Sequence, residues 1–90
     1  MSLLTYKNRD IVPTPADKEV FEQAVQNAVR ELYRSGTRVI HIYSIYTVTR
    51  WQRTPGTSHR IGYAIRKFGL VKIAKPNNPD IYRIPAEAVA

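Results

Sequence analysis

The chain contains no cysteine, and it has only two histidines, His41 and His59. The absence of cysteine excludes a disulfide framework and any metal site built on thiolates. No cluster of Asp or Glu lies near either histidine, so a metal site or a Ser-His-Asp arrangement is difficult to assemble. A glycine-rich phosphate loop is also missing. We therefore expect no metal, no cofactor and no enzymatic activity. A tyrosine nucleophile for strand cleavage is the one catalytic alternative, and so few acids in so short a chain disfavour it.

Long apolar runs are absent as well. None approaches the ~18 residues that cross a bilayer. The opening residues 1–7 do not show the cationic and then apolar order of a secretory signal. We expect a soluble, cytoplasmic protein without a membrane partner, associated with the nucleoid if it is cellular. Ninety residues supply one hydrophobic core, and so small a domain gains stability from dimerisation.

Acidic residues are scarce in the second half of the chain. Residues 1–36 carry five Lys/Arg and five Asp/Glu, whereas residues 37–83 carry nine Lys/Arg and a single acid, Asp80, a net charge of +8. A neutral half followed by a basic half is typical of a scaffold that carries a polyanion-binding face. A solvated basic surface is the alternative, and we favour nucleic-acid binding.

The pattern of apolar, capping and turn residues predicts an α+β domain over residues 14–85, with an arm at 1–13 and a short tail at 86–90. Thr14 caps a first helix, with Pro15 at its first position and Asp17 in the capping box. This helix runs to Gly36 and carries one apolar stripe: Val20, Phe21, Ala24, Val25, Ala28, Val29, Leu32 and Tyr33.

Shorter elements follow the first helix. Residues 38–42 are rich in β-branched side chains and predict a strand. Ser44 caps a second helix over 45–53, although its β-branched residues leave a longer strand open. Thr57 or Ser58 begins a third helix that ends at Phe68 and Gly69. Residues 70–73 and 81–84 flank a turn-rich hexapeptide and predict an antiparallel hairpin.

The order helix, strand, helix, turn, helix, hairpin resembles a winged helix-turn-helix domain. Residues 58–70, Ser-His-Arg-Ile-Gly-Tyr-Ala-Ile-Arg-Lys-Phe-Gly-Leu, look like a recognition helix that runs into the first strand of the wing. The size and style are similar to the small winged-helix regulators of archaeal viruses and plasmids. The resemblance implies this fold and a double-stranded DNA partner. The second helix departs from the commoner pattern because it is unusually rich in Ile, Thr, Val and Tyr.

The third helix is predicted to be the recognition helix, which contacts the bases of the DNA. Its inward face is Ile61, Ala64, Ile65 and Phe68, and the opposite face offers side chains that hydrogen-bond to bases. The candidates for base reading are Ser58, His59, Arg60 and Tyr63. The candidates for phosphate binding are Arg50, Arg53, Thr57, Arg66 and Lys67. The candidates in the wing are Lys72, Lys75, Asn77, Asn78 and Arg83.

The function that follows is a sequence-specific DNA-binding regulator. We expect a homodimer on a palindromic site, because the stripe of the first helix and the apolar residues of the arm exceed what one small core consumes. A DNA-coating architectural protein, or a centromere-binding protein of plasmid partition, is the first alternative. An RNA-binding or protein-bridging winged helix is the second, and a hairpin with only Tyr82 as an aromatic residue argues mildly against RNA.

Overall fold

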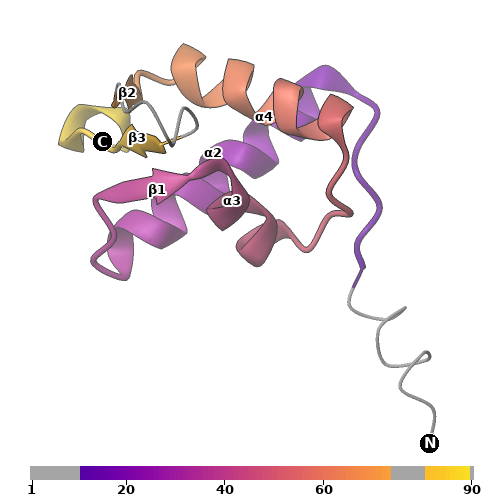
Figure 1. Ribbon diagram of the computed structural model, residues 1–90, viewed down its shortest axis with the longest axis horizontal. Helices are drawn as coiled ribbons and strands as arrows, with labels where there is room; N and C mark the ends of the chain where they lie inside the picture. Colours follow the sequence, from indigo (N-terminus) through magenta and orange to yellow (C-terminus); the bar gives the residue numbers. More distant parts are fainter. Residues whose placement is uncertain (1–10, 74–80, 90) are drawn as a thin grey trace, which may run out of the picture.

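A computed structural model describes residues 11–73 and 81–89. Within them the chain forms three α-helices, a three-stranded antiparallel sheet and a final 3-10 turn (Figure 1). The elements are α2 (Lys18–Arg34), β1 (Val39–His41), α3 (Ile42–Thr49), α4 (Pro55–Lys67), β2 (Val71–Lys72), β3 (Ile81–Arg83) and η1 (Ala86–Ala88). This is the small α+β domain that the sequence predicts, with the elements in the expected order.

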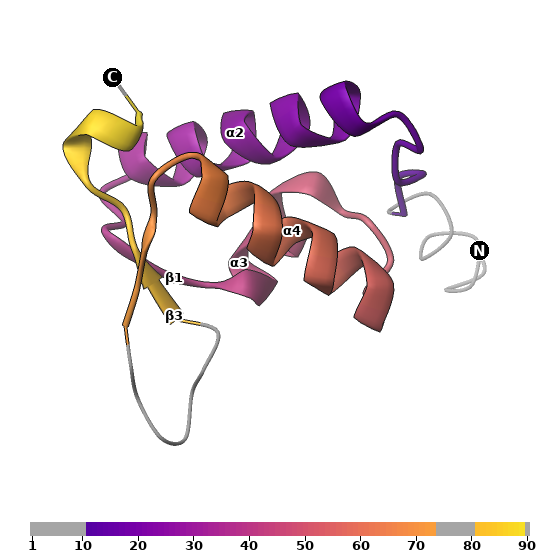
Figure 2. The same cartoon turned by 90° about the horizontal axis from the view of Figure 1, so that it is seen from above.

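The sheet has the strand order β1-β3-β2. The predicted hairpin is present as the pair β2–β3, with Val71 opposite Arg83, although both strands are shorter than expected. The first strand β1 joins the other edge of β3, with Val39 opposite Arg83 and His41 opposite Ile81. Figure 2 shows the sheet at one end of the helices, beside the ends of α2 and α4 from which the chain enters β1 and β2.

Helix α2 begins three residues later than the sequence suggests. Asp17, not Thr14, is the N-cap, because its carboxylate accepts a hydrogen bond from the Val20 N–H (3.1 Å). The helix ends at Arg34, and Gly36 follows with φ of +100°. The Gly36 and Thr37 N–H groups donate to the carbonyls of Tyr33 and Leu32, which is a Schellman motif. The predicted end of the helix at Gly36 is thus confirmed, and the prediction of Thr14 as its N-cap is wrong.

Helix α3 differs from the second helix that the sequence predicts at 45–53 with Ser44 as its N-cap. It begins at Ile42, directly after β1, because the His41 Nδ1 accepts the Tyr43 N–H (3.1 Å). Its β-branched composition opposes a helix, but Ile42, Ile45 and Tyr46 share one buried side. Burial therefore outweighs local propensity. The helix ends at Thr49, and its C-cap Arg50 adopts a left-handed φ of 63° and donates its N–H to the Tyr46 carbonyl.

Helix α4 also begins earlier than expected. Thr54, not Thr57 or Ser58, caps it, and Pro55 occupies the first turn, where a missing N–H costs nothing. The predicted inward face is confirmed, since Ile61, Ala64 and Ile65 are each 0% exposed. Phe68 is only partly buried and packs against the core.

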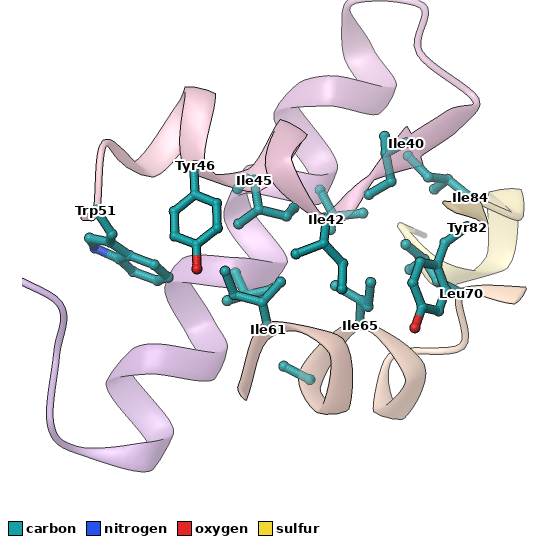
Figure 3. Close-up of a cluster of buried hydrophobic side chains, with 14 of the residues drawn as sticks. Ile40, Ile42, Ile45, Tyr46, Trp51, Ile61, Ile65, Leu70, Tyr82 and Ile84 are labelled. Atoms are coloured by element: carbon teal, nitrogen blue, oxygen red, sulfur yellow. The ribbon is translucent and has the colours of Figure 1, made fainter. Parts of the chain in front are cut away.

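The core lies where the three helices and the inner face of the sheet meet (Figure 3). Ile42 and Ile45 of α3 point toward Ile61 and Ile65 of α4 (Figure 3). Gly62 is buried there, and a Cβ added to it would lie 3.4 Å from the Ile42 Cδ1, so α3 approaches α4 closely at this position. Within the described part of the chain, no charged side chain is buried. No helix of that part is both long and apolar enough to span a bilayer.

Two glycines test whether the end of α2 requires a residue that tolerates a positive φ. Gly36 has a left-handed φ with open space around it, whereas Gly56 lies in α4 with ordinary φ and open space. We expect Gly36→Ala to lower the free energy of unfolding by about 1 kcal/mol, because a Cβ is disfavoured at positive φ. Gly56→Ala should raise it by about 0.5 kcal/mol, because alanine favours the helix. Urea denaturation measures both values. An equal change in both variants would contradict this account of the α2 C-terminus.

Candidate nucleic-acid interface

The solvent side of α4 carries three exposed side chains in helical spacing: His59, Tyr63 and Arg66. Tyr63 is 54% exposed, which is high for so large an apolar ring. The Arg66 Nε donates to the Gly62 carbonyl (3.2 Å), so the side chain leans along the helix. Helix α4 contains no acidic residue. The three side chains, which we call the outer face of α4, therefore combine hydrogen-bonding groups with positive charge.

Arg60, predicted to read bases, has a different environment. Its guanidinium carbon lies 3.9 Å from the centre of the Phe21 ring, and its Nη2 donates to the Pro15 carbonyl (3.2 Å). Phe21 in turn stacks on Trp51, with ring centres 4.8 Å apart and an angle of 19° between the planes. This Trp51–Phe21–Arg60 stack joins α2, the α3–α4 turn and α4. The geometry gives Arg60 a packing role on the flank of α4.

Lys67 lies on the same flank, against α2. Its Nζ is 2.9 Å from the Glu22 Oε1, and this hydrogen bond and the charge of Glu22 raise the pKa of the lysine above its usual value. The lysine side chain is half exposed, so the pair adds little to stability. One of the positive charges that the sequence assigns to phosphate is thus already balanced by a carboxylate.

Ser58 and Thr57 lie on the inner side of the first turn of α4. The Ser58 Oγ is 2.8 Å from the Tyr46 hydroxyl of α3. The Thr57 N–H donates to the Thr54 Oγ1 at 3.1 Å. Both residues are only partly exposed, and their polar groups serve the cap and the α3–α4 contact. The structure does not bring them to the outer face with His59 and Tyr63.

The predicted second helix at 45–53 includes Arg50 and Arg53, and this placement is wrong. Both residues are exposed, but Arg50 caps α3 and Arg53 lies in the turn before α4. The Arg50 carbonyl accepts the Val12 N–H (2.9 Å), which attaches the segment before α2 to this turn. The Arg53 guanidinium lies 4.8 Å from the Tyr43 ring centre. The turn thus presents two cations beside the start of α4.

In the predicted wing, Lys72 of β2 and Arg83 of β3 are exposed. Arg83 lies in register between Val39 and Val71 and shares with them the outer face of the sheet. Lys75, Asn77 and Asn78 lie outside the described residues.

Sequence reasoning missed the contribution of α2 to this surface. A hollow of about 430 Å³ separates α2 from α4 and is lined by Lys18, Phe21, Glu22, His59, Arg60 and Tyr63. The Lys18 Nζ lies 5.9 Å from the centre of the Tyr63 ring. Contacts of Arg60 and Lys67 with residues 45 positions earlier leave no local pattern in the sequence, so no sequence signal pointed to them.

Comparison with protein-family models, with curated proteins and with solved structures gives no match. In residues 11–73 and 81–89, no group of three or more His, Asp or Glu side chains is placed to hold a metal ion. The function is therefore inferred from the fold and the surface alone.

The packing role of Arg60 has a measurable consequence. We expect Arg60→Ala to lower the free energy of unfolding by about 1–2 kcal/mol, through loss of the ring contact and of the hydrogen bond to Pro15. Arg66→Ala is the matched control and should change it by less than about 0.5 kcal/mol, because Arg66 is exposed and its hydrogen bond goes to a carbonyl of its own helix. Trp51, the single tryptophan, reports unfolding through its fluorescence. Equal small losses in both variants would show that the stack does not hold α4.

Proposed function

We propose that the chain is a sequence-specific, double-stranded DNA-binding regulator with a winged helix-turn-helix fold. In this proposal α4 enters the major groove, and the β2–β3 hairpin lies along the backbone or the minor groove. The three helices and the strand order β1-β3-β2 are compatible with that architecture. They support the fold assignment together with the order of elements along the sequence.

The observation that carries the proposal is the two-sided character of α4. Its inner side packs into the core through Ile61, Ala64 and Ile65, which are fully buried. Its outer face presents His59, Tyr63 and Arg66, and the helix contains no acidic residue. A major groove about 12 Å wide admits one α-helix with its side chains. A helix that is buried on one side and carries a basic, hydrogen-bonding outer face meets that requirement.

The residues divide into two roles in this proposal. His59 and Tyr63 reach the base edges, because they lie nearer the N-terminus of α4, and the N-terminal residues of a recognition helix contact the bases. Arg66, Arg53 and Arg50 bind phosphates, which set the register of the protein on the duplex without reading sequence. Arg60 and Ser58 hold α4 against α2 and α3. Lys72 and Arg83 supply charge from the sheet.

The salt dependence of duplex binding tests the proposed contacts between basic side chains and DNA phosphates. Affinity should fall on the order of a hundredfold between 50 and 200 mM salt, since each neutralised phosphate releases about 0.9 counterion. Arg66→Ala should weaken binding to all sequences and reduce the salt slope by about 1. Arg34→Ala removes the same charge from the far end of α2 and should leave both quantities nearly unchanged. Fluorescence anisotropy with a labelled duplex measures them.

A flat salt dependence, or equal losses in the Arg66 and Arg34 variants, would refute binding through α4. Footprinting on mixed genomic fragments then separates a regulator from a DNA-coating protein. A discrete protected palindrome supports the regulator, whereas protection that extends along the fragment supports the coating protein.

Homodimerisation is the second part of the proposal, but the stripe of α2 supplies no broad interface. Phe21, Val25, Ala28 and Val29 are consumed by the chain's own core, and Val20 is exposed among polar neighbours. The outer face of the sheet keeps Val39 and Val71 at 51% and 44% exposure on either side of Arg83. These two valines are the better candidates for contact between copies.

Sedimentation equilibrium tests the dimer. A species of twice 10.3 kDa should appear at micromolar concentration. Val39→Lys should weaken self-association about tenfold or more, because it places a charge on the proposed contact. Val20→Lys, an equally exposed valine on α2, is the control and should not change it. A mass of 10.3 kDa at every concentration would rule out the dimer. Equal effects of the two lysine substitutions would show that the dimer interface does not lie on the outer face of the sheet.

A further inference from the structure

We propose that the hollow between α2 and α4 binds a small aromatic anion, a planar ring that carries a carboxylate or a phosphate. Its volume, about 430 Å³, lies in the range of small-ligand sites. Both helices contribute to its lining, with Lys18, Phe21 and Glu22 from α2 and His59, Arg60 and Tyr63 from α4.

The cationic groups of the hollow favour an anion. Lys18 and Arg60 face it with the His59 imidazole, and the one carboxylate of the lining, Glu22, is already paired with Lys67 at 2.9 Å. Arg60 is held by two contacts, its ring contact with Phe21 and its hydrogen bond to Pro15. Because the guanidinium is already ordered, its remaining N–H groups can bind a carboxylate or phosphate with little further loss of conformational entropy.

The ring of the ligand is recognised by Tyr63 and by the stacked guanidinium. Tyr63 is half exposed, so its ring can contact a second planar group, and Lys18 lies 5.9 Å from its centre. Phe21 is 1% exposed and supports the Arg60 guanidinium from within the core. A planar cation backed by a ring offers a flat surface on which an aromatic ligand stacks.

Another hollow has a different lining and does not support the same ligand. The one beside α3, lined in part by Tyr43, Trp51 and Arg53, contains a single basic side chain. The hollow between α2 and α4 joins more positive charge to an exposed ring. An aromatic anion therefore fits it better than the site beside α3.

Occupancy of the hollow has a regulatory consequence, which rests on the proposed function. His59 and Tyr63 belong both to the lining and to the outer face of α4. A ligand that holds these two side chains makes them unavailable to a base pair. Ligand and duplex should therefore compete, and the ligand should release the protein from DNA.

Direct titration of the DNA-free protein tests the site. Phenyl phosphate is the probe, followed by calorimetry and by backbone amide shifts. We expect saturable binding, about tenfold tighter than that of inorganic phosphate, which has the charge without the ring, and than that of benzyl alcohol, which has the ring without the charge. Benzoate should bind in the same manner as phenyl phosphate. No binding, or equal binding of phenyl phosphate and inorganic phosphate, would overturn the proposal.

Matched variants locate the site. Lys18→Ala should weaken phenyl phosphate binding about tenfold. Arg34→Ala, the same change of charge near the other end of α2, should not alter it. Equal effects of both variants would show attraction to the net charge of the protein and would overturn a built site.

Competition with a labelled duplex tests the consequence. Phenyl phosphate should raise the apparent Kd of the wild-type protein for DNA, and this effect should be lost in Lys18→Ala. Simultaneous binding of both partners would overturn the competition. If the wild-type protein fails to bind any duplex, the proposed function fails, whereas the titration of the DNA-free protein still decides whether the hollow is a site.

Discussion

Burial of one side of α4 is the constraint on which the rest of the molecule depends. Ile61, Ala64 and Ile65 belong to the core, where α4 packs against α2 and α3, and have no exposed area. Rotating the helix about its axis would return these side chains to water, at a cost of about 1.5–3 kcal/mol for each of the larger ones. Because the helical period is fixed, the same burial determines that His59, Tyr63 and Arg66 face solvent together.

The flank of α4 that meets α2 shows why a count of charges along the chain overstates the cations available to a polyanion. Arg60 packs on Phe21 and Lys67 pairs with Glu22, so the neutral first half of the chain engages two of the bases of the second half. These contacts also form the hollow that shares His59 and Tyr63 with the outer face. The proposed DNA interface and the proposed ligand site are therefore parts of one surface, and neither is independent of the position of α2.

Much of the fold was accessible from the sequence because its signals are local. The apolar spacing of residues 61–65 predicted the buried side of α4, and the glycines at 36 and 69 marked the ends of two helices. Turn residues between two β-rich runs predicted the β2–β3 pair. The division of charge between the two halves of the chain is likewise a property of the sequence alone. Periodicity, helix stops and turns depend on residues within a few positions of one another, so a single sequence contains them.

Tertiary structure decided where the elements begin and which side chains remain available. The β-branched segment 42–49 is a helix because Ile42, Ile45 and Tyr46 bury one side against the rest of the core, against its local propensity. The hydrogen-bond partners of Arg60 and Lys67 lie 45 residues away in the sequence, so only the tertiary structure shows that these two side chains are drawn away from the outer face. The sequence by itself determined the order of the elements and the sign of the charge. Packing between distant segments determined where those charges lie, because a side chain that gains a buried ring or a carboxylate as its partner is held beside that partner and not on the outer face of α4.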